Sequence, residues 1–221
     1  MSAAATGSAG EGLFVTLEGG EGSGKSTLTV ALAGRAREAG HTVVTTREPG
    51  GTPLGERLRA ALLDSKDAPS PEAELLVFAA ARAELVARVI RPALERGALV
   101  LSDRYADSTV AYQQYGRGLS QELVRAANES ATGGLTPALT LLLDIAPEQG
   151  IARSGGASDY LERDALEFHA RVRDGYRALA EGDPGRWVTL DATQPRDALA
   201  EAAWGRLSVL LRASPSARLS G

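Results

Sequence analysis

The sequence predicts an α/β fold in which a five-stranded parallel sheet lies between layers of helices, three layers in all. Short stretches that are apolar on both faces alternate with longer stretches of helical spacing. Such strands are typical of parallel sheets that helices cover on both sides. A glycine-rich loop follows the first of these stretches, and polar residues follow the next two. Parallel sheets bind ligands beyond the carboxyl ends of their strands, so these residues should share one edge.

Local composition accounts for the elements in the first part of the chain. An apolar run at 13–17 is the first expected strand, and a helix should follow at about 25–40, ending on a glycine. The β-branched run 42–46 is the second expected strand. Proline and glycine in 47–52 require a loop, after which a helix is expected at about 54–63.

A long helix is expected to begin after Ser70. Ser70 is a good N-cap, Pro71 suits the first helical position, and Glu72 places an acid in the first turn. The helix should end at about Arg96, with a possible kink at Pro92. Its solvent-facing side is expected to carry Glu72, Glu74 and Glu84.

The rest of the chain continues the alternation of strands and helices. Apolar runs predict strands at 98–101, 138–143 and 187–190. Helices are expected at about 107–114, 121–130, 160–181 and 195–211, with one more that begins near Pro147 and is interrupted at Gly155 and Gly156.

Length and composition predict a single domain. With 221 residues, 43% hydrophobic and 24% charged, the chain can bury a substantial core. The domain should span residues 12–212, between a disordered lead at 1–11 and a frayed tail at 213–221.

Charge and residue usage argue against several classes of partner. The net charge of −4 argues against a nucleic-acid partner, and no apolar run approaches the roughly 18–20 residues of a membrane span. Residues 1–11 lack the basic and apolar regions of a signal peptide, so the cytoplasm is the expected compartment. Because cysteine is absent and His41 and His169 lie far apart, a thiolate or zinc site is not expected.

The loop after the first strand matches G-x-x-x-x-G-K-[ST], the phosphate-binding P-loop. Its residues are Gly19, Gly20, Glu21, Gly22, Ser23, Gly24, Lys25, Ser26 and Thr27. Glycines let backbone N–H groups turn inward around a polyphosphate, and the following helix adds its positive N-terminus. Lys25 should reach the β- and γ-phosphates of a nucleotide, and the Ser26 hydroxyl should ligate Mg²⁺.

Charged residues also follow the second and third expected strands. Asp103 can hold Mg²⁺ through water beside the P-loop serine, and Arg104 offers a planar fork for a phosphate. Arg47, before a Glu-Pro-Gly-Gly loop, fits the same role. An alternative for the Asp-Arg pair is that it only caps a strand end, and a lone loop arginine is usually solvated.

Phe78 and Arg82 lie four residues apart and therefore share one face of the long helix. An aromatic ring beside a cation suits a flat base that carries carbonyl groups. An alternative of equal weight is that Phe78 belongs to the core and Arg82 covers its edge.

Taken together and in order, these motifs resemble those of the thymidylate kinase family. The resemblance rests on 14–27, 46–52, 78–82, 103–105, Ser108 and 111–113, and extends over about 12–212. It implies the P-loop NTPase fold and the phosphorylation of dTMP to dTDP, with ATP as co-substrate and Mg²⁺ as cofactor. Members are usually homodimers, so a second copy of the chain is the expected partner.

The resemblance implies roles for the matching positions. Phe78 would stack on the thymine ring and Arg82 would hydrogen-bond a base carbonyl. Arg47 and Arg104 would hold the acceptor phosphate, and Glu21 would meet the sugar 3′-hydroxyl. Ser108, Thr109 and Gln113 would line the base pocket. Tyr112 would crowd the 2′ position of the sugar and so disfavour ribonucleotides. The loop under the adenine would be Asp191, Ala192 and Thr193.

The resemblance also implies a mobile lid at about 152–163. Family members without an arginine in the P-loop, as here, supply arginine from the lid. This segment holds Arg153 and Arg163, whereas Tyr160 stands where the family usually shows an arginine. We expect Arg153 to act, because it precedes the flexible stretch 154–156, and Arg163 remains the alternative. The residues expected to act on the transferring group are Lys25, Arg47, Asp103, Arg104 and Arg153.

Two other functions stay open. A kinase for a different acceptor, such as another nucleotide or a shikimate-like alcohol, would share the P-loop. An inactive nucleotide-binding regulatory module would explain why the lid lacks the arginine that the family usually has. The presence of Lys25, Ser26 and Asp103 argues against this function.

Overall fold

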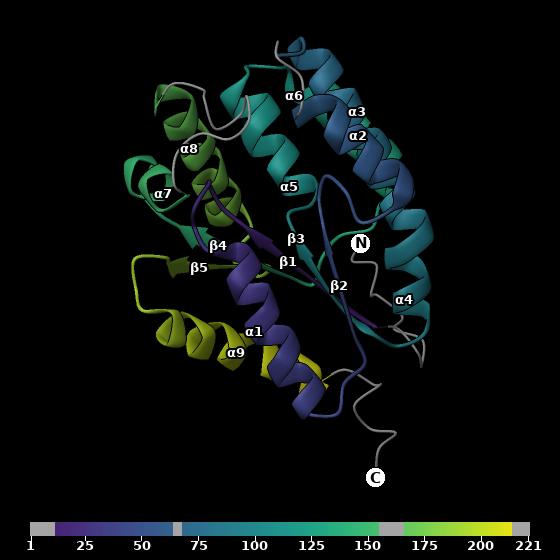
Figure 1. The fold of residues 1–221 in the computed structure, drawn as a ribbon, viewed down its shortest axis with the longest axis vertical. Helices are drawn as coiled ribbons and strands as arrows, with labels where there is room; N and C mark the ends of the chain where they lie inside the picture. Colours follow the sequence, from purple (N-terminus) through teal and green to yellow (C-terminus); the bar gives the residue numbers. More distant parts are fainter. Residues whose placement is uncertain (1–11, 64–67, 155–165, 214–221) are drawn as a thin grey trace, which may run out of the picture.

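The computed structural model describes residues 12–63, 68–154 and 166–213 of the 221-residue chain. Its centre is a five-stranded sheet in the order β2-β3-β1-β4-β5, and every neighbouring pair is parallel (Figure 1). The strands are β1 (Leu13–Glu18), β2 (Val43–Arg47), β3 (Leu99–Asp103), β4 (Leu139–Asp144) and β5 (Trp187–Asp191). The expected fold class is confirmed, and no strand boundary differs from its expected position by more than two residues.

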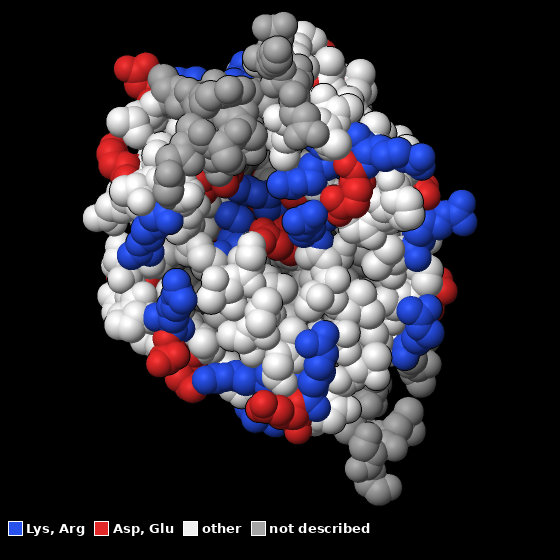
Figure 2. All heavy atoms as spheres, viewed as in Figure 1, with Lys and Arg blue, Asp and Glu red and all other residues white. Residues whose placement is uncertain are grey.

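The strand register brings polar residues to one edge of the sheet. Arg47 at the end of β2 pairs with Asp103 at the end of β3, and Asp144 of β4 pairs with Asp191 of β5. This is the carboxyl edge, where parallel sheets bind ligands. On the face seen in Figure 2, Lys and Arg side chains gather in and around a hollow, with Asp and Glu side chains among them.

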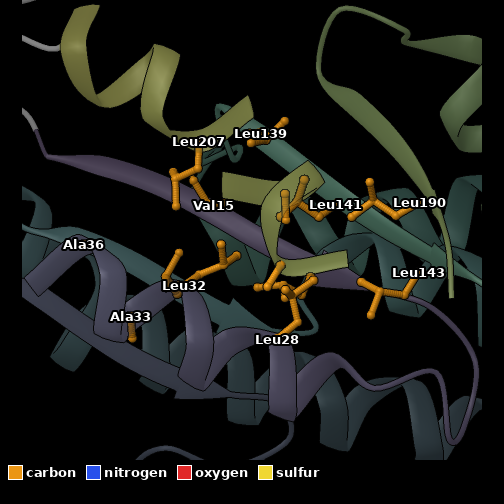
Figure 3. Packing of buried hydrophobic residues seen from close by; sticks show 14 of the residues in the cluster. Val15, Leu28, Leu32, Ala33, Ala36, Leu139, Leu141, Leu143, Leu190 and Leu207 are labelled. Carbon is orange, nitrogen blue, oxygen red and sulfur yellow. The ribbon is translucent and has the colours of Figure 1, made fainter. Parts of the chain in front are cut away.

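Two helices cover one face of the sheet. They are α1 (Lys25–Glu38) and α9 (Arg196–Ala213). Alternate strand residues such as Val15 and Leu141 are fully buried against Leu32 of α1 and Leu207 of α9 (Figure 3). Because these side chains leave no gap toward solvent, the P-loop between β1 and α1 is held by a rigid core.

The strand residues that point the other way are buried as well. Phe14 and Val100 pack against α3 (Pro71–Leu85) and the segment that follows it, while Leu142 packs against α8 (Leu166–Gly182). Burial on both faces explains why the strands read as continuous apolar runs in the sequence. Four further helices are α2 (Pro53–Leu63), α5 (Ala106–Thr109), α6 (Gln121–Thr132) and α7 (Pro147–Ser154).

The long helix expected at 71–96 contains a wide turn. After α3 comes the π-helical segment η1 (Val86–Ile90), followed by α4 (Arg91–Glu95). The N–H of Arg91 bonds to the carbonyl of Val86, five residues back, immediately before Pro92. Proline lacks an N–H and crowds the preceding turn, so a widened turn accommodates it. The possible irregularity at Pro92 thus takes the form of a π-turn.

A second π-helical segment replaces most of the helix expected at 107–114. After the short α5, the segment η2 (Val110–Gly116) carries Tyr112 and Gln113. Hydrophobic spacing does not distinguish π from α turns over so few residues, so the sequence could not predict it. Such segments often lie at functional sites.

Several expectations fall outside the described residues: the lead at 1–11, the tail from 214 on, and the lid residues from 155 on. The expected helix at 160–181 is seen from Leu166. Within the described ranges, no helix combines the length and apolar character needed to cross a membrane. The cytoplasmic location stays a prediction.

Candidate active site

The P-loop forms a closed turn between β1 and α1. Gly22 has φ 62° and Gly24 has φ 98°, conformations that favour glycine, and a Cβ on Gly22 would collide with the carbonyl of Gly150. Lys25 Nζ donates to the carbonyls of Gly19 at 3.1 Å and Gly20 at 2.8 Å. The lysine therefore lies across the loop. A bound polyphosphate would replace these two carbonyls as the hydrogen-bond partner of Lys25.

The end of β3 faces the start of α1. The Ser26 hydroxyl donates to Asp103 Oδ2 at 2.6 Å, although 77 positions separate the two residues. A hydroxyl and a carboxylate are oxygen ligands of the kind that Mg²⁺ prefers. No group of three His, Cys, Asp or Glu side chains gathers to hold a metal in the described part of the chain. Two protein oxygens fit Mg²⁺, because it usually keeps several waters and binds nucleotide phosphates.

A large open groove runs along the P-loop. Its lining includes most of the residues expected around ATP, namely Glu21, Gly22, Ser23, Gly24, Lys25, Ser26, Thr27, Ala192 and Thr193, together with Arg47, Asp103, Arg104 and Arg153. Gly19, Gly20 and Asp191 do not line it. Arg47 reaches this groove, where its guanidinium pairs with Glu56 at 3.1 Å.

The far end of the groove is formed by α7 and the loop after β5. Arg153 Nη1 donates to the carbonyl of Ala192 at 2.7 Å. Asp191 holds the same loop, because its carboxylate accepts from the N–H of Thr193 at 2.9 Å and from Gln194 Nε2 at 2.9 Å. Arg153 and the expected adenine loop are thus in direct contact.

A second pocket, with about 410 Å³ of empty space, adjoins the groove. Eight of the nine residues expected to bind the acceptor line it: Glu21, Phe78, Arg82, Arg104, Ser108, Thr109, Tyr112 and Gln113. The ninth, Arg47, does not, while Glu48 and Pro49 line the pocket without having been expected. Phe78 is only partly buried, which argues against the reading of it as a core residue.

Arg104 and Glu21 line both cavities and pair with each other at 2.5 Å. Arg104 also donates to the carbonyl of Gly19 at 3.1 Å and to the hydroxyl of Tyr176 at 3.2 Å. Its φ of 73° is unusual for a residue with a side chain. These contacts hold the guanidinium at the junction between groove and pocket, where two phosphorylated ligands would meet.

Neighbouring charges set the ionisation of the two P-loop side chains. Burial alone would raise the pKa of Glu21, but the positive charges of Arg104 and Lys25 outweigh it and lower that pKa to about 2. Burial, and then repulsion from Arg104, lower the pKa of Lys25 to about 8, against the attraction of Glu21 and Asp103. Polyphosphate binding would restore the lysine's affinity for its proton, since it adds negative charge.

Arg82 is held rigidly beneath the second pocket. Its Nε donates to Glu48 Oε2 at 2.7 Å, Nη1 to Asn128 Oδ1 at 2.7 Å, and Nη2 to the carbonyl of Tyr105 at 3.1 Å. The residue is 2% exposed. Glu48 Oε1 is buried and has no partner in the described part of the chain. Arg82 is thus an oriented cation in the pocket wall, which differs from a cap on the edge of Phe78.

Glu18 was not expected to matter and lies under Arg104. It is fully buried, and its carboxylate accepts from the N–H of Tyr105 at 2.8 Å, from Ser108 Oγ at 2.5 Å and from the Tyr176 hydroxyl at 3.1 Å. The same two hydroxyls meet Arg104. An acid at the end of an apolar strand, just before the P-loop, was the available signal for it.

We expect Glu18 to make the stability of the protein fall as the pH rises. Burial, and then Asp107, raise the pKa of Glu18 from 4.5 to about 8. Between these values the folded state holds the proton more tightly than the unfolded chain, so stability declines across this window by up to about 1.4 kcal/mol per pH unit. Glu18→Gln stays neutral and should remove that decline. Urea unfolding at pH 5 to 9 measures it, with the exposed Glu72→Gln as control; parallel profiles for Glu18→Gln and the unmodified protein would contradict the assignment.

One sequence expectation is wrong, and two others concern residues outside the described part of the chain. Glu74 was assigned to a solvated helix face with Glu72 and Glu84, but it is 0% exposed and pairs with Arg117 at 3.2 Å. Helical spacing alone could not show this, because the partner comes from a different element. Tyr160 and Arg163 lie outside the described residues.

Comparisons with known proteins agree with the family resemblance. A family model described as thymidylate kinase matches residues 17–203. A thymidylate kinase of Deinococcus radiodurans is 52% identical over 200 residues, covering 90% of this chain and 97% of that protein. One of Thermomicrobium roseum is 50% identical over 202 residues, covering 90% and 96%. The crystal structure of a thymidylate kinase from Ehrlichia chaffeensis superposes with a TM-score of 0.71 at 31% identity, covering 91% of this chain and 99% of that one.

Proposed function

This chain belongs to the thymidylate kinase family, and from that premise we propose that it transfers the γ-phosphoryl group of ATP to dTMP, giving dTDP and ADP. The observation that carries the proposal is the meeting of two cavities at Arg104 and Glu21. One cavity is a P-loop groove for a nucleoside triphosphate. The other is a pocket lined by Phe78 and Arg82. As a nucleoside monophosphate kinase, the protein is a phosphotransferase of nucleotide biosynthesis.

The donor nucleotide lies along the P-loop in this proposal. Lys25 contacts the β- and γ-phosphates in place of the loop carbonyls that it now meets. Backbone N–H groups of the loop and the N-terminus of α1 hold the other phosphate oxygens. Asp191, Ala192 and Thr193 form the floor under the adenine, beside Arg153.

The acceptor lies in the second pocket, with its phosphate toward Arg104. The fork of Arg104 is held in place before the substrate arrives, so little reorganisation is needed at reaction. Arg47 reaches the same phosphate from the groove side. Tyr112 donates to Glu21 at 2.8 Å, and this hydrogen bond orients the carboxylate toward the sugar 3′-hydroxyl. The ring of Tyr112 fills the space that a 2′-hydroxyl would need. The transfer is in line and needs no covalent intermediate.

We propose Mg²⁺ as the cofactor, bound by the Ser26 hydroxyl and through water by Asp103. When bound, Mg²⁺ would neutralise part of the phosphate charge of ATP. The chain itself holds the Ser26 hydroxyl oxygen and Asp103 Oδ2 2.6 Å apart at the N-terminus of α1.

We propose a homodimer as the working assembly. Leu54 of α2, Leu76 of α3 and Leu123 of α6 are 41%, 60% and 39% exposed, and α3 packs against both neighbouring helices. Exposed leucines on three adjacent helices are a reason for a second chain to cover them. Light scattering coupled to gel filtration gives the mass of the particle; a mass of one chain at micromolar concentration would contradict the dimer.

A coupled ADP-release assay tests the proposed reaction. It compares dTMP, dUMP, UMP, CMP, GMP and shikimate as acceptors, with ATP and Mg²⁺ in excess. We expect dTMP to give the highest kcat/KM. Preference for another acceptor would indicate a kinase of different specificity, and ATP binding without turnover on any acceptor would indicate a regulatory module.

The lid cation gives a separate prediction. Negative charge spreads over the transferring group, and the P-loop holds Glu21 where an arginine would offset that charge. Arg153→Ala should slow single turnover at saturating ATP and dTMP by about 10- to 100-fold, and Arg153→Lys should recover only part of the rate, because a point charge does not reproduce the fork. If Arg153→Ala reacts at the normal rate and Arg163→Ala is slow, Arg163 and not Arg153 supplies the lid cation.

A further inference from the structure

Glu74 is a buried acid that the proposed mechanism does not use. It lies in the first turn of α3 and is 0% exposed. Its Oε1 accepts from Gln113 Nε2 at 2.6 Å, and its Oε2 accepts from Arg117 Nη2 at 3.2 Å. Gln113 is 1% exposed and lines the base pocket, which Glu74 itself does not. Glu74 therefore stands directly behind a pocket residue.

The contact with Glu74 decides which end of the Gln113 amide faces Glu74. A carboxylate only accepts hydrogen bonds, so the amide must present its NH₂ group to Glu74. The amide oxygen then points away from Glu74 and is left for a ligand of the pocket. An amide with no such neighbour could turn over and offer either group.

Arg117 holds Glu74 in this position. The guanidinium donates to Glu74 from both Nε at 3.4 Å and Nη2 at 3.2 Å, and lies 4.3 Å from the centre of the Phe168 ring. Phe168 is a buried residue of α8 and belongs to a hydrophobic cluster. The acid is thus fixed by charge and by packing, and the orientation of Gln113 is fixed with it.

Among the polar side chains of the pocket lining, Gln113 and Arg82 can therefore offer an acceptor and a donor. Gln113 offers its amide oxygen, and Arg82 offers the second hydrogen of Nη1, since the first goes to Asn128. Thymine and uracil carry an N3–H donor next to the O4 acceptor, which matches this pair. Cytosine carries an N3 acceptor next to an amino donor, which opposes it at both positions. A site built to hydrogen-bond one pattern rejects the other strongly.

We propose that Glu74 is a positioning residue that sets the choice of thymine over cytosine, by fixing the amide of Gln113 with its oxygen toward the base. This inference rests on the proposed function, because it concerns the acceptor pocket of that reaction. Glu74 touches no substrate and acts only through Gln113.

The test compares the unmodified protein with Glu74→Gln for dTMP, dUMP and dCMP at saturating ATP. A glutamine at position 74 both donates and accepts, so the amide of Gln113 can turn over. The preference for dTMP over dCMP, as a ratio of kcat/KM values, should fall by about tenfold or more. The KM for dTMP should rise about tenfold, while kcat stays within about threefold. The ratio of dTMP to dUMP should not move, because the two bases share this edge. Glu72→Gln, an exposed acid of the same turn, is the matched control.

The exchange variant E74Q/Q113E keeps one carboxylate and one amide in the pair. The amide introduced at position 74 donates to the carboxylate introduced at position 113. The other oxygen of that carboxylate again offers an acceptor to the base, so the dTMP preference should return. An unchanged preference in a folded Glu74→Gln, or a lost preference in the folded exchange variant, would overturn the proposal. If Glu74→Gln does not fold, as thermal unfolding would show, the exchange variant alone decides. An unmodified protein that does not phosphorylate dTMP would instead refute the proposed function.

Discussion

Replacing Lys25 with alanine is expected to lower kcat by about a thousandfold, which corresponds to roughly 4 kcal/mol of transition-state stabilisation. Lys25 is 7% exposed and its Nζ is held by Gly19, Gly20 and Ser23 Oγ at 2.8 to 3.2 Å. Its charge is therefore in place before ATP binds, and costs little reorganisation at the moment of transfer. The KM for dTMP should change little, because the acceptor pocket does not include this residue.

A pH profile of the kinetics tests the role of the Lys25 charge independently. Because its pKa is about 8, the protonated form is lost from the free enzyme above that pH. The kcat/KM for ATP should fall above about pH 8, while kcat, which reports the nucleotide complex, should fall only at higher pH. Lys25→Met keeps most of the side-chain volume and should be as slow as Lys25→Ala. The exposed Arg57→Ala removes one positive charge elsewhere and should match the unmodified protein. A Lys25→Met rate within about tenfold of that protein would remove Lys25 from this role.

The sequence could predict those parts of the site that depend on neighbouring residues or on the local pattern of strands and helices. The P-loop is one motif in which glycine, lysine and serine stand at fixed spacing, so both its position and its geometry followed. Arg47 and Asp103 followed from a topological rule, because each ends an apolar strand and parallel strands end at one edge. Phe78 and Arg82 followed from helical spacing, supported by the family resemblance.

The parts that could not be predicted depend on contacts between distant segments. Glu18 meets Ser108 across 90 positions, and Glu74 meets Arg117 across 43. An acid reads as solvated unless its partner is known, because burying a carboxylate without one is costly. Spacing on one helix cannot reveal a partner that another helix supplies. The π-helical segment η2, which aims Gln113 at Glu74, is likewise set by tertiary packing.

Replacing Arg104 with alanine should lower kcat/KM for dTMP by about a thousandfold and leave the KM for ATP within a few-fold. Arg104 stands where groove and pocket join, so it is the cation best placed to meet both the acceptor phosphate and the incoming phosphoryl group. Arg104→Lys should recover only part of the loss, because lysine cannot make the two parallel hydrogen bonds of the fork. The exposed Arg88→Ala, whose side chain is 75% exposed, is the control for loss of charge.

The same substitution also leaves Glu21 without its nearest cation, and this second effect must be separated from the first. The pKa of Glu21 lies below its unfolded value, so its pairing stabilises the fold above about pH 4.5 and this contribution is lost as the pH falls toward 2. Arg104→Ala should therefore lower Tm at neutral pH. In the double variant Glu21→Gln/Arg104→Ala the unpaired carboxylate is gone, so Tm should recover while kcat/KM for dTMP stays low relative to Glu21→Gln alone. If activity recovers together with Tm, Arg104 serves only to pair Glu21, and the acceptor phosphate must be bound elsewhere.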